Sequence, residues 1–151
     1  MNQAKSFQHA SAALDLDSFS EGVLTSEAAQ AAVEGARLSD YRFDRYKSKP
    51  SPKKEVQLTL VSQNEESSKS LRAAVAEAEI LAEAVYFTRD IANEPPNVMT
   101  PPAVAKAVKA MASKNGLDCK VLGLSEIKKL GMGGVIGVSQ GSNFPPQFVI
   151  L

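Results

Sequence analysis

A glycine-rich run, GMGGVIG at residues 131–137, is the first pattern in this sequence that could bind a ligand. Such runs cradle phosphates when glycines stand at relative positions one, three and six, after a strand and at the start of a helix. Here the sixth position is Ile136, and the run is expected to follow a helix and enter a strand. It also lacks the Gly-Lys-Ser/Thr ending of a P-loop. We therefore interpret it as a structural turn.

The chain has one histidine, His9, and one cysteine, Cys119. A catalytic triad or a histidine metal site needs partners that the sequence does not supply, so we interpret His9 as a solvated residue. Cys119 lies in an expected strand between Asp118 and Lys120, with no histidine available to activate it. We interpret it as a small buried hydrophobe and not as a nucleophile.

Carboxylates could bind metal ions or transfer protons, but here they are scattered along the chain. The candidates are Asp15, Asp17, Glu77, Glu79, Glu83, Asp90 and Glu94. The two early aspartates are expected to be isolated, the next three residues to lie on a helix surface, and the last two to flank a helix end. No cluster for a two-metal site results. The sequence therefore predicts no catalytic, metal-binding or substrate-binding residue within residues 1–151.

Aromatic and basic residues interleave between residues 41 and 55. The alternating residues are Tyr41, Arg42, Phe43, Arg45, Tyr46 and Lys47. Such a segment could stack on bases and contact phosphates. The other interpretation is a segment after a helix whose aromatic rings are buried while its charges stay in water. We favour the second, because no other basic patch supports nucleic-acid binding.

Composition sets the broad class of protein. The chain has 151 residues, 44% of them hydrophobic, and its seventeen basic residues balance seventeen acidic ones. This length suits one domain or parts of two, and the zero net charge does not favour nucleic acid or an anionic membrane. There is no apolar run near the roughly 18–20 residues that span a bilayer, and no apolar signal core near the start. With a single cysteine, we expect a soluble, cytoplasmic protein.

The first two-thirds of the sequence predicts helices and one strand. Residues 12–16 fit a short strand or a helix end equally well. Ser26 is expected to cap a helix in which Ala28, Ala31, Ala32, Gly35 and Leu38 fall on one face, most of them small residues. Residues 56–61 alternate like a half-buried strand. A long helix over 71–92, capped by Ser67 or Ser68, carries Leu71, Val75, Ala78, Leu81 and Val85 on one stripe. It should end near Asn93, because Pro95 cannot continue it.

The last third predicts a second α/β region. Thr100 and Pro101 should start a helix, and Gly116 should end it. Strands are expected over 117–122, 135–139 and 148–151, and a short helix capped by Ser125 over 126–130. Because the chain ends inside an expected strand, we expect it to be cut short. Its open strand edges should make the isolated chain marginally folded, oligomeric or poorly soluble.

Two segments, TRDIANEPPNVMTPPAVAKAV and LGLSEIKKLGMGGVIGVSQGSNFPPQFVIL, resemble the leucyl aminopeptidase (cytosol aminopeptidase) family of metallopeptidases. The family shows R-D-L-x-N-x-P-P-N at its domain junction, followed by L-G-M-G and G-V-x-Q-G-S. The matching positions are Arg89, Asp90, Asn93, Pro95, Pro96, Asn97, Leu130, Gly131, Met132, Gly133, Gly137, Val138, Gln140, Gly141 and Ser142, with Ile91 a departure. Residues 34–48 also resemble the end of the family's N-terminal domain.

The resemblance implies an α/β fold in three parts. Residues 1–66 would be the end of an N-terminal macro-like domain, 67–97 a linker helix and proline junction, and 98–151 the start of the catalytic domain. Family enzymes release N-terminal residues from peptides with two divalent metals (manganese, zinc or magnesium) and assemble as homohexamers. Their metal ligands, catalytic lysine and N-T-D-A-E-G-R motif are absent here. The chain is therefore expected to bind no metal and to be inactive alone. The alternative is a non-catalytic assembly or regulatory partner of a full-length aminopeptidase.

Overall fold

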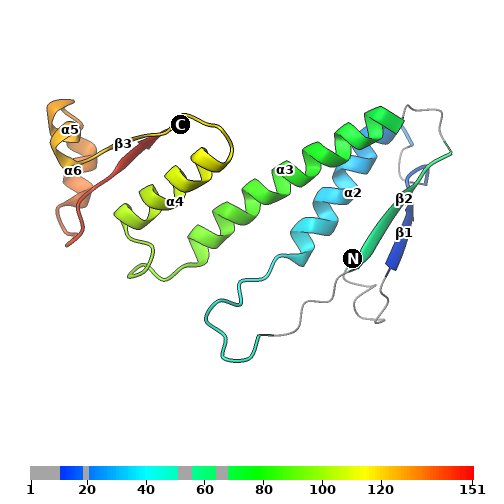
Figure 1. Cartoon of the computed structure of the whole chain (residues 1–151), viewed down its shortest axis with the longest axis horizontal. Coiled ribbons are helices and arrows are strands. Elements are labelled where there is room, and N and C mark those ends of the chain that lie inside the picture. The colour runs from blue at the N-terminus through cyan, green and yellow to red at the C-terminus, as the bar shows by residue number, and fades with distance from the viewer. Residues whose placement is uncertain (1–10, 19–20, 51–55, 64–67) are drawn as a thin grey trace. The chain divides into compact units, whose positions relative to one another are not determined.

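The computed structural model describes residues 11–18, 21–50, 56–63 and 68–151 (Figure 1). The chain forms two compact units, residues 1–90 and residues 91–151. The first contains strand β1 (Ser11–Asp15), helix α2 (Thr25–Asp40), strand β2 (Gln57–Val61) and most of helix α3 (Ser68–Asn93). The second continues with α4 (Pro101–Lys114), β3 (Lys120–Leu122), α5 (Leu124–Lys129), α6 (Gly133–Ser139) and β4 (Phe148–Ile150). This mixture confirms the predicted α/β class.

In the first unit, β1 and β2 form a parallel pair, with Ser11 opposite Gln57 and Asp15 opposite Val61. Along both strands, exposed and half-buried residues alternate, as the side-chain period of two requires. The strand expected over 56–61 is confirmed, and the ambiguous stretch at 12–16 is a strand. Leu16 follows β1 and is one of the most buried side chains described, with 2% of its surface exposed.

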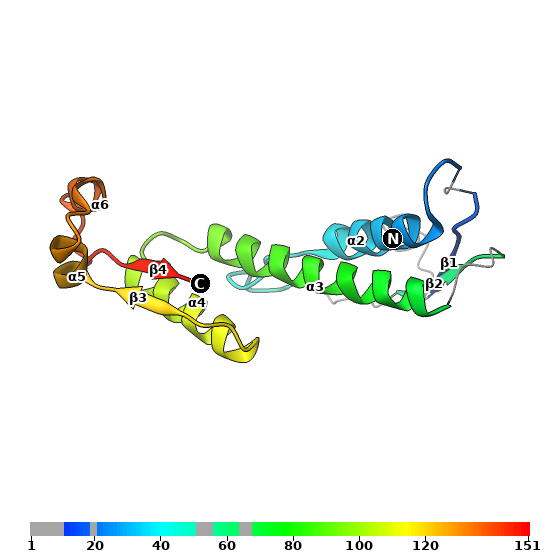
Figure 2. The same cartoon turned by 90° about the horizontal axis from the view of Figure 1, so that it is seen from above.

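Helices α2 and α3 run side by side in the same direction (Figures 1 and 2). The buried residues of α2 are Thr25, Ala29 and Val33, which recur at the four-residue spacing of one helix face. The predicted small-residue face was therefore wrong. The predicted Ser26 cap was also wrong, because the helix already begins at Thr25, with Leu24 at the capping position.

The long helix expected over 71–92 is confirmed as α3, which ends at Asn93 as Pro95 requires. Ser68 is its first residue, whereas Ser67 lies outside the described residues. Its buried side chains are Ala74, Ala78 and Ala82. Leu81, placed on the buried stripe by the sequence pattern, is 43% exposed. The buried face is thus made of alanines, and the bulky leucine lies beside it.

The carboxylate of Asp17 ties the ends of the two strands together. It accepts hydrogen bonds from the hydroxyl of Ser62 at 2.8 Å and the backbone N–H of Gln63 at 2.7 Å. Asp15 accepts a bond from Asp17 N at 3.1 Å. The expectation that these aspartates are isolated was wrong, because strand pairing brings residues 45 and 46 positions apart into contact. The Gln63 N–H, followed by the Ser62 hydroxyl, lowers the pKa of Asp17.

This lowered pKa predicts a loss of stability in acid. A carboxylate whose pKa is lower in the folded state stabilises the fold above its unfolded pKa, near 3.9, and loses that contribution as pH falls through the folded value. We expect the thermal midpoint of the first unit to fall as the pH drops below about 4. In Asp17→Asn, this part of the pH dependence should disappear. Glu83→Gln, at an exposed position of the first unit, is the matched control; identical pH profiles for Asp17→Asn and the parent would contradict the assignment.

In the second unit, α4 begins with two prolines after Thr100, whose side chain makes no capping hydrogen bond. The predicted starting position of this helix is confirmed, but the Thr100 hydroxyl does not form the expected capping hydrogen bond. Gly116, with φ +69°, follows the end of the helix, where a left-handed residue releases the chain. β3 pairs with β4 in antiparallel fashion, Lys120 opposite Ile150 and Leu122 opposite Phe148. The strand expected over 117–122 is therefore shorter, whereas that at 148–151 is confirmed.

The largest error concerns residues 135–139, expected as a strand and found in helix α6. Val135, Ile136 and Ser139 are its half-buried residues, and together with the half-buried Met132 just before the helix they follow the three- and four-residue spacing of a helix. A short helix before it is confirmed as α5, but Gly123 and not Ser125 precedes its first residue. The carboxylate of Glu126 accepts a bond from Gly123 N at 3.1 Å and closes this start. Gly131, with φ +66°, provides the turn between the helices.

Candidate functional site

A two-metal peptidase site needs a cluster of carboxylate, histidine or similar ligands. Across the described ranges, no three His, Cys, Asp or Glu side chains come together in a group that could hold a metal ion. His9 lies outside the described residues, and Cys119 is a half-buried free thiol next to β3. These residues therefore do not fit the metals that the family resemblance implies.

Two of the candidate carboxylates, Asp90 and Glu79, have structural partners in the fold. Asp90 accepts a hydrogen bond from the hydroxyl of Tyr41 at 2.8 Å. Glu79 forms an ion pair with Arg37, 3.0 Å from the guanidinium Nε, and both side chains are about 40% exposed. Glu94 is buried, with 6% of its surface exposed, next to the end of α3. We infer that these groups stabilise the fold and are not arranged for proton transfer.

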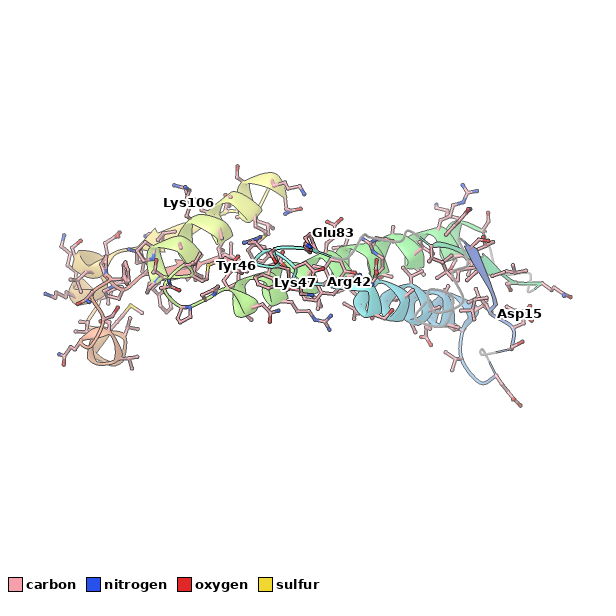
Figure 3. All side chains as sticks on the ribbon, turned by 90° about the horizontal axis from the view of Figure 1, so that it is seen from below. Asp15, Arg42, Tyr46, Lys47, Glu83 and Lys106 are labelled. Carbon is pink, nitrogen blue, oxygen red and sulfur yellow. The ribbon has the colours of Figure 1, made fainter. Side chains whose placement is uncertain are left out.

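The aromatic and basic segment after α2 is a loop over its described residues, 41–50. Figure 3 shows Arg42, Tyr46 and Lys47 on this loop. The guanidinium of Arg45 lies over the ring of Phe43 at 5.8 Å, and Phe43 packs against Tyr46 with ring centroids 5.9 Å apart. Because a neighbouring residue already covers the Phe43 ring, this geometry favours the structural interpretation over base stacking. The expectation that the aromatic rings are buried was wrong for Tyr46, which is 57% exposed, whereas Tyr41 and Phe43 are half-buried.

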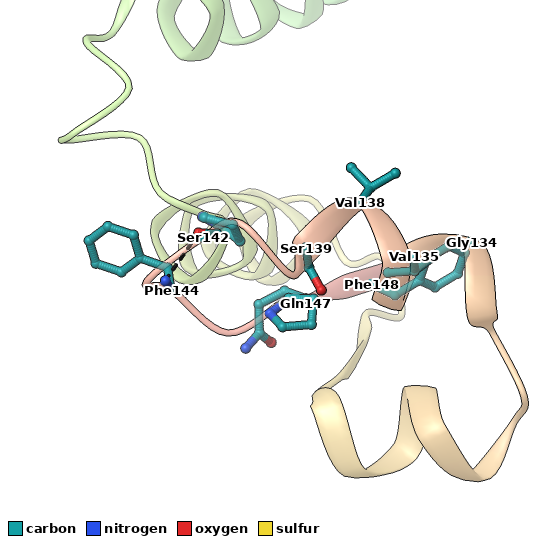
Figure 4. Close-up of a pocket in the computed structure, with 10 residues that line it drawn as sticks. Gly134, Val135, Val138, Ser139, Ser142, Phe144, Gln147 and Phe148 are labelled. Atoms are coloured by element: carbon teal, nitrogen blue, oxygen red, sulfur yellow. Dashed lines mark hydrogen bonds between the residues drawn. The ribbon is translucent and has the colours of Figure 1, made fainter.

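The second unit contains an open hollow of about 570 Å³ between α6, the segment before β4 and Pro101 (Figure 4). Its lining is mostly apolar and includes Val135, Val138, Phe144 and Phe148. The polar members are Ser139, Ser142 and Gln147, and Ser142 Oγ accepts a bond from Phe144 N at 3.1 Å. None of the described residues that line it is acidic or basic. The hollow can make apolar contacts but offers no general acid or base.

Several apolar side chains of the second unit face water. Val138 is 90% exposed, Leu130 64% and Leu151 63%. Exposed apolar surface of this kind marks a region that other polypeptide can cover, or a liability for association. None of the helices in the described part of the chain combines the length and hydropathy needed to cross a bilayer.

Comparison with known proteins gives the class. The family model for the N-terminal domain of the cytosol aminopeptidase family matches residues 1–50, and the model for its catalytic domain matches residues 86–151. The two matches follow in chain order on either side of most of α3. The chain therefore belongs to the cytosol aminopeptidase family and covers the junction between its two domains.

Individual relatives agree with this assignment. A probable cytosol aminopeptidase of Solibacter usitatus is 44% identical over 139 residues, which are 92% of this chain and 28% of the relative. One of Aquifex aeolicus is 37% identical over 131 residues, covering 86% of this chain and 25% of the relative. The chain thus spans about a quarter of the length of these curated relatives.

Solved structures share the fold. The bottromycin maturation enzyme BotP in complex with Mn is 36% identical with a TM-score of 0.76, and the match covers 93% of this chain and 29% of BotP. A mutant of tomato leucine aminopeptidase has a TM-score of 0.81 at 23% identity, over 98% of this chain and 30% of that one. The latter likeness is evidence for the fold alone.

Proposed function

We propose that these 151 residues serve as the domain-junction segment of a cytoplasmic, metal-dependent aminopeptidase that releases N-terminal residues from peptides. The observation that carries the proposal is the pair of family matches, to the N-terminal domain over 1–50 and the catalytic domain over 86–151. We place the N-terminal part at 1–66, the linker at 67–97 and the start of the peptidase domain at 98–151. The start of the catalytic match and the boundary between the compact units, after Asp90, both fall inside this linker.

In this proposal the residues described here contribute architecture and no chemical step. Family enzymes use divalent metals, manganese, zinc or magnesium, to activate water and stabilise the tetrahedral transition state. The manganese bound in the related BotP structure supports a metal-dependent reaction. No metal-ligand group occurs among the described side chains. The metals would therefore be bound by other residues of a complete enzyme, and the catalytic lysine would also come from that other part. We propose that the complete enzyme assembles as a homohexamer and that its substrates are peptides.

The first test is an aminopeptidase assay of the purified 151-residue chain with leucine p-nitroanilide and added Mn²⁺. We expect no turnover above the buffer rate, because the described side chains offer no site where a metal could activate water. An unaltered family enzyme under the same conditions is the positive control. Turnover that is removed by a chelator would contradict the assignment of a purely architectural role.

A chimera tests the other half of the proposal. The homologous segment of the Solibacter relative is replaced by residues 1–151 of this chain, and metal-dependent peptidase activity is compared with that of the unaltered relative. An active chimera is expected, because the two segments are 44% identical over 139 residues. A chimera that folds and assembles but cannot hydrolyse peptides would mean that this segment is not equivalent to a peptidase junction.

A second candidate function is a non-catalytic partner that docks on a full-length aminopeptidase. The exposed Leu130, Val138 and Leu151 favour it, because such surface is buried when a partner covers it. Mixing the chain with a full-length family enzyme and analysing the mixture by size-exclusion chromatography distinguishes the two functions. Co-elution of the two proteins that is reduced by Val138→Lys would support the partner role. Separate elution would contradict that role and favour the junction-segment function.

A further inference from the structure

The C-terminal end of α2 is closed by side chains of α3. The last carbonyls of a helix have no partners within the helix. Here the hydroxyl of Tyr86 donates to the carbonyl of Arg37, and Arg89 Nη1 donates to the carbonyl of Leu38 at 3.1 Å. A cation at this end is also favourable because the helix dipole is negative there. The α3 residues therefore cap α2 from outside.

The same α3 residues hold Tyr41, the first residue after α2. Its hydroxyl donates to the carboxylate of Asp90 at 2.8 Å. Its ring lies 5.3 Å from the ring of Tyr86, tilted by 48°. The guanidinium of Arg89 lies 5.4 Å from the Tyr41 ring centroid, within the range of a cation–π contact. Tyr41, Tyr86, Arg89 and Asp90 thus form one connected group, which we name the helix-end clasp.

We propose that the helix-end clasp is a conformational lock, in which Arg89 and Asp90 hold the end of α2 and the start of the loop 41–50 on α3. These two residues open the R-D-x-x-N-x-P-P-N pattern, and the contacts assign them to architecture and not to a substrate or a metal. Each engages α2 or Tyr41 through atoms that would otherwise be free for a ligand. Loss of the clasp releases the loop while the two helices remain.

The loop itself provides the test, because trypsin can cut after the exposed residues Arg42, Arg45 and Lys47. Proteolysis follows the population of the opened form when opening is fast relative to cleavage. In Tyr41→Phe and in Arg89→Lys we expect cleavage in the loop to rise about three- to tenfold. This is the effect expected when one partly exposed hydrogen bond to a charged or carbonyl partner is lost. Cleavage after Lys106 and Lys109, in the other unit, should not change.

Arg72→Lys is the matched control, an exposed arginine on the same helix. Near-ultraviolet circular dichroism gives a second measure, because the chain has no tryptophan and two of its three tyrosines belong to the clasp. The tyrosine signal should weaken in Arg89→Lys, which keeps all three tyrosines, and persist in Arg72→Lys. Loop cleavage equal to the parent in both clasp variants would overturn the proposal. It would also be overturned by cleavage that rises equally at all sites, or by a parent loop cut as fast as a free peptide of residues 41–50.

Discussion

Replacing Ile127 by alanine is expected to unfold most of the second compact unit, residues 91–151, under conditions in which the parent is folded. Ile127 has none of its surface exposed and is among the largest fully buried side chains described. Removing a buried isoleucine costs about 2–5 kcal/mol, from lost transfer free energy and the cavity left behind. A unit of this size has a total stability of only about 3–5 kcal/mol. Hydrogen exchange followed by mass spectrometry should show loss of protection in peptides from β3, α5 and β4.

Leu130→Ala is the matched control, since Leu130 follows α5 but is 64% exposed. Its removal should change protection little, because an exposed side chain leaves no cavity. All three tyrosines belong to the first unit, so their near-ultraviolet signal reports on that unit separately. Protection in α5 that matches the parent in Ile127→Ala would mean that Ile127 does not hold this unit together.

Backbone restrictions made the helix ends predictable from sequence. Pro95 stops α3, and Pro101 starts α4, through steric effects that act within one or two residues. Gly116 ends α4 for an equally local reason, a positive φ. The alternation along β2 could also be predicted from the sequence, because the side chains of a strand with one buried face point to that face at every second residue.

Short apolar segments were not predictable in the same way. Residues 135–139 are rich in β-branched side chains, which favour strands, yet they form α6. The spacing of Met132, Val135 and Ile136 carried the helical signal, but seven residues are too few to separate the two periods. Residues 11–15 became a strand through pairing with residues 57–61, a partner 46 positions away. The composition of residues 11–15 alone does not identify a pairing partner so far along the chain.

The sequence predicted no catalytic residue among the candidates, and that stays a prediction; the contacts that the candidates make were not foreseen. Tyr41 meets Asp90 and Arg89 meets Leu38 across 49 and 51 positions, and only the packing of α2 on α3 brings them together. For the aromatic segment at 41–47, the sequence favoured a structural role over nucleic-acid binding without showing which residues it contacts. The contacts that explain this segment are made with Arg89 and Tyr86. Both lie on α3, and the sequence pattern does not show that they meet the segment.

The alanine face of α3 leads to the second large effect, the substitution Ala78→Leu. Ala78 is fully buried and stands between Ala74 and Ala82, which are 8% and 1% exposed. Three extra carbon atoms at this position must displace neighbouring atoms, and overpacking of a dense interior costs about 1–3 kcal/mol or more. We expect the thermal midpoint of the first unit to fall by about 5–15 °C, measured by the tyrosine near-ultraviolet signal.

Ala76→Leu makes the same chemical change two residues away, at an exposed position of the same helix. Alanine and leucine have similar helix propensities, so this control should leave the midpoint almost unchanged. The difference between the two variants isolates the packing of the alanine face from the stability of the helix itself. Equal midpoints would mean that the face tolerates a bulky side chain, and that residues other than Ala78 set how α3 packs in the first unit.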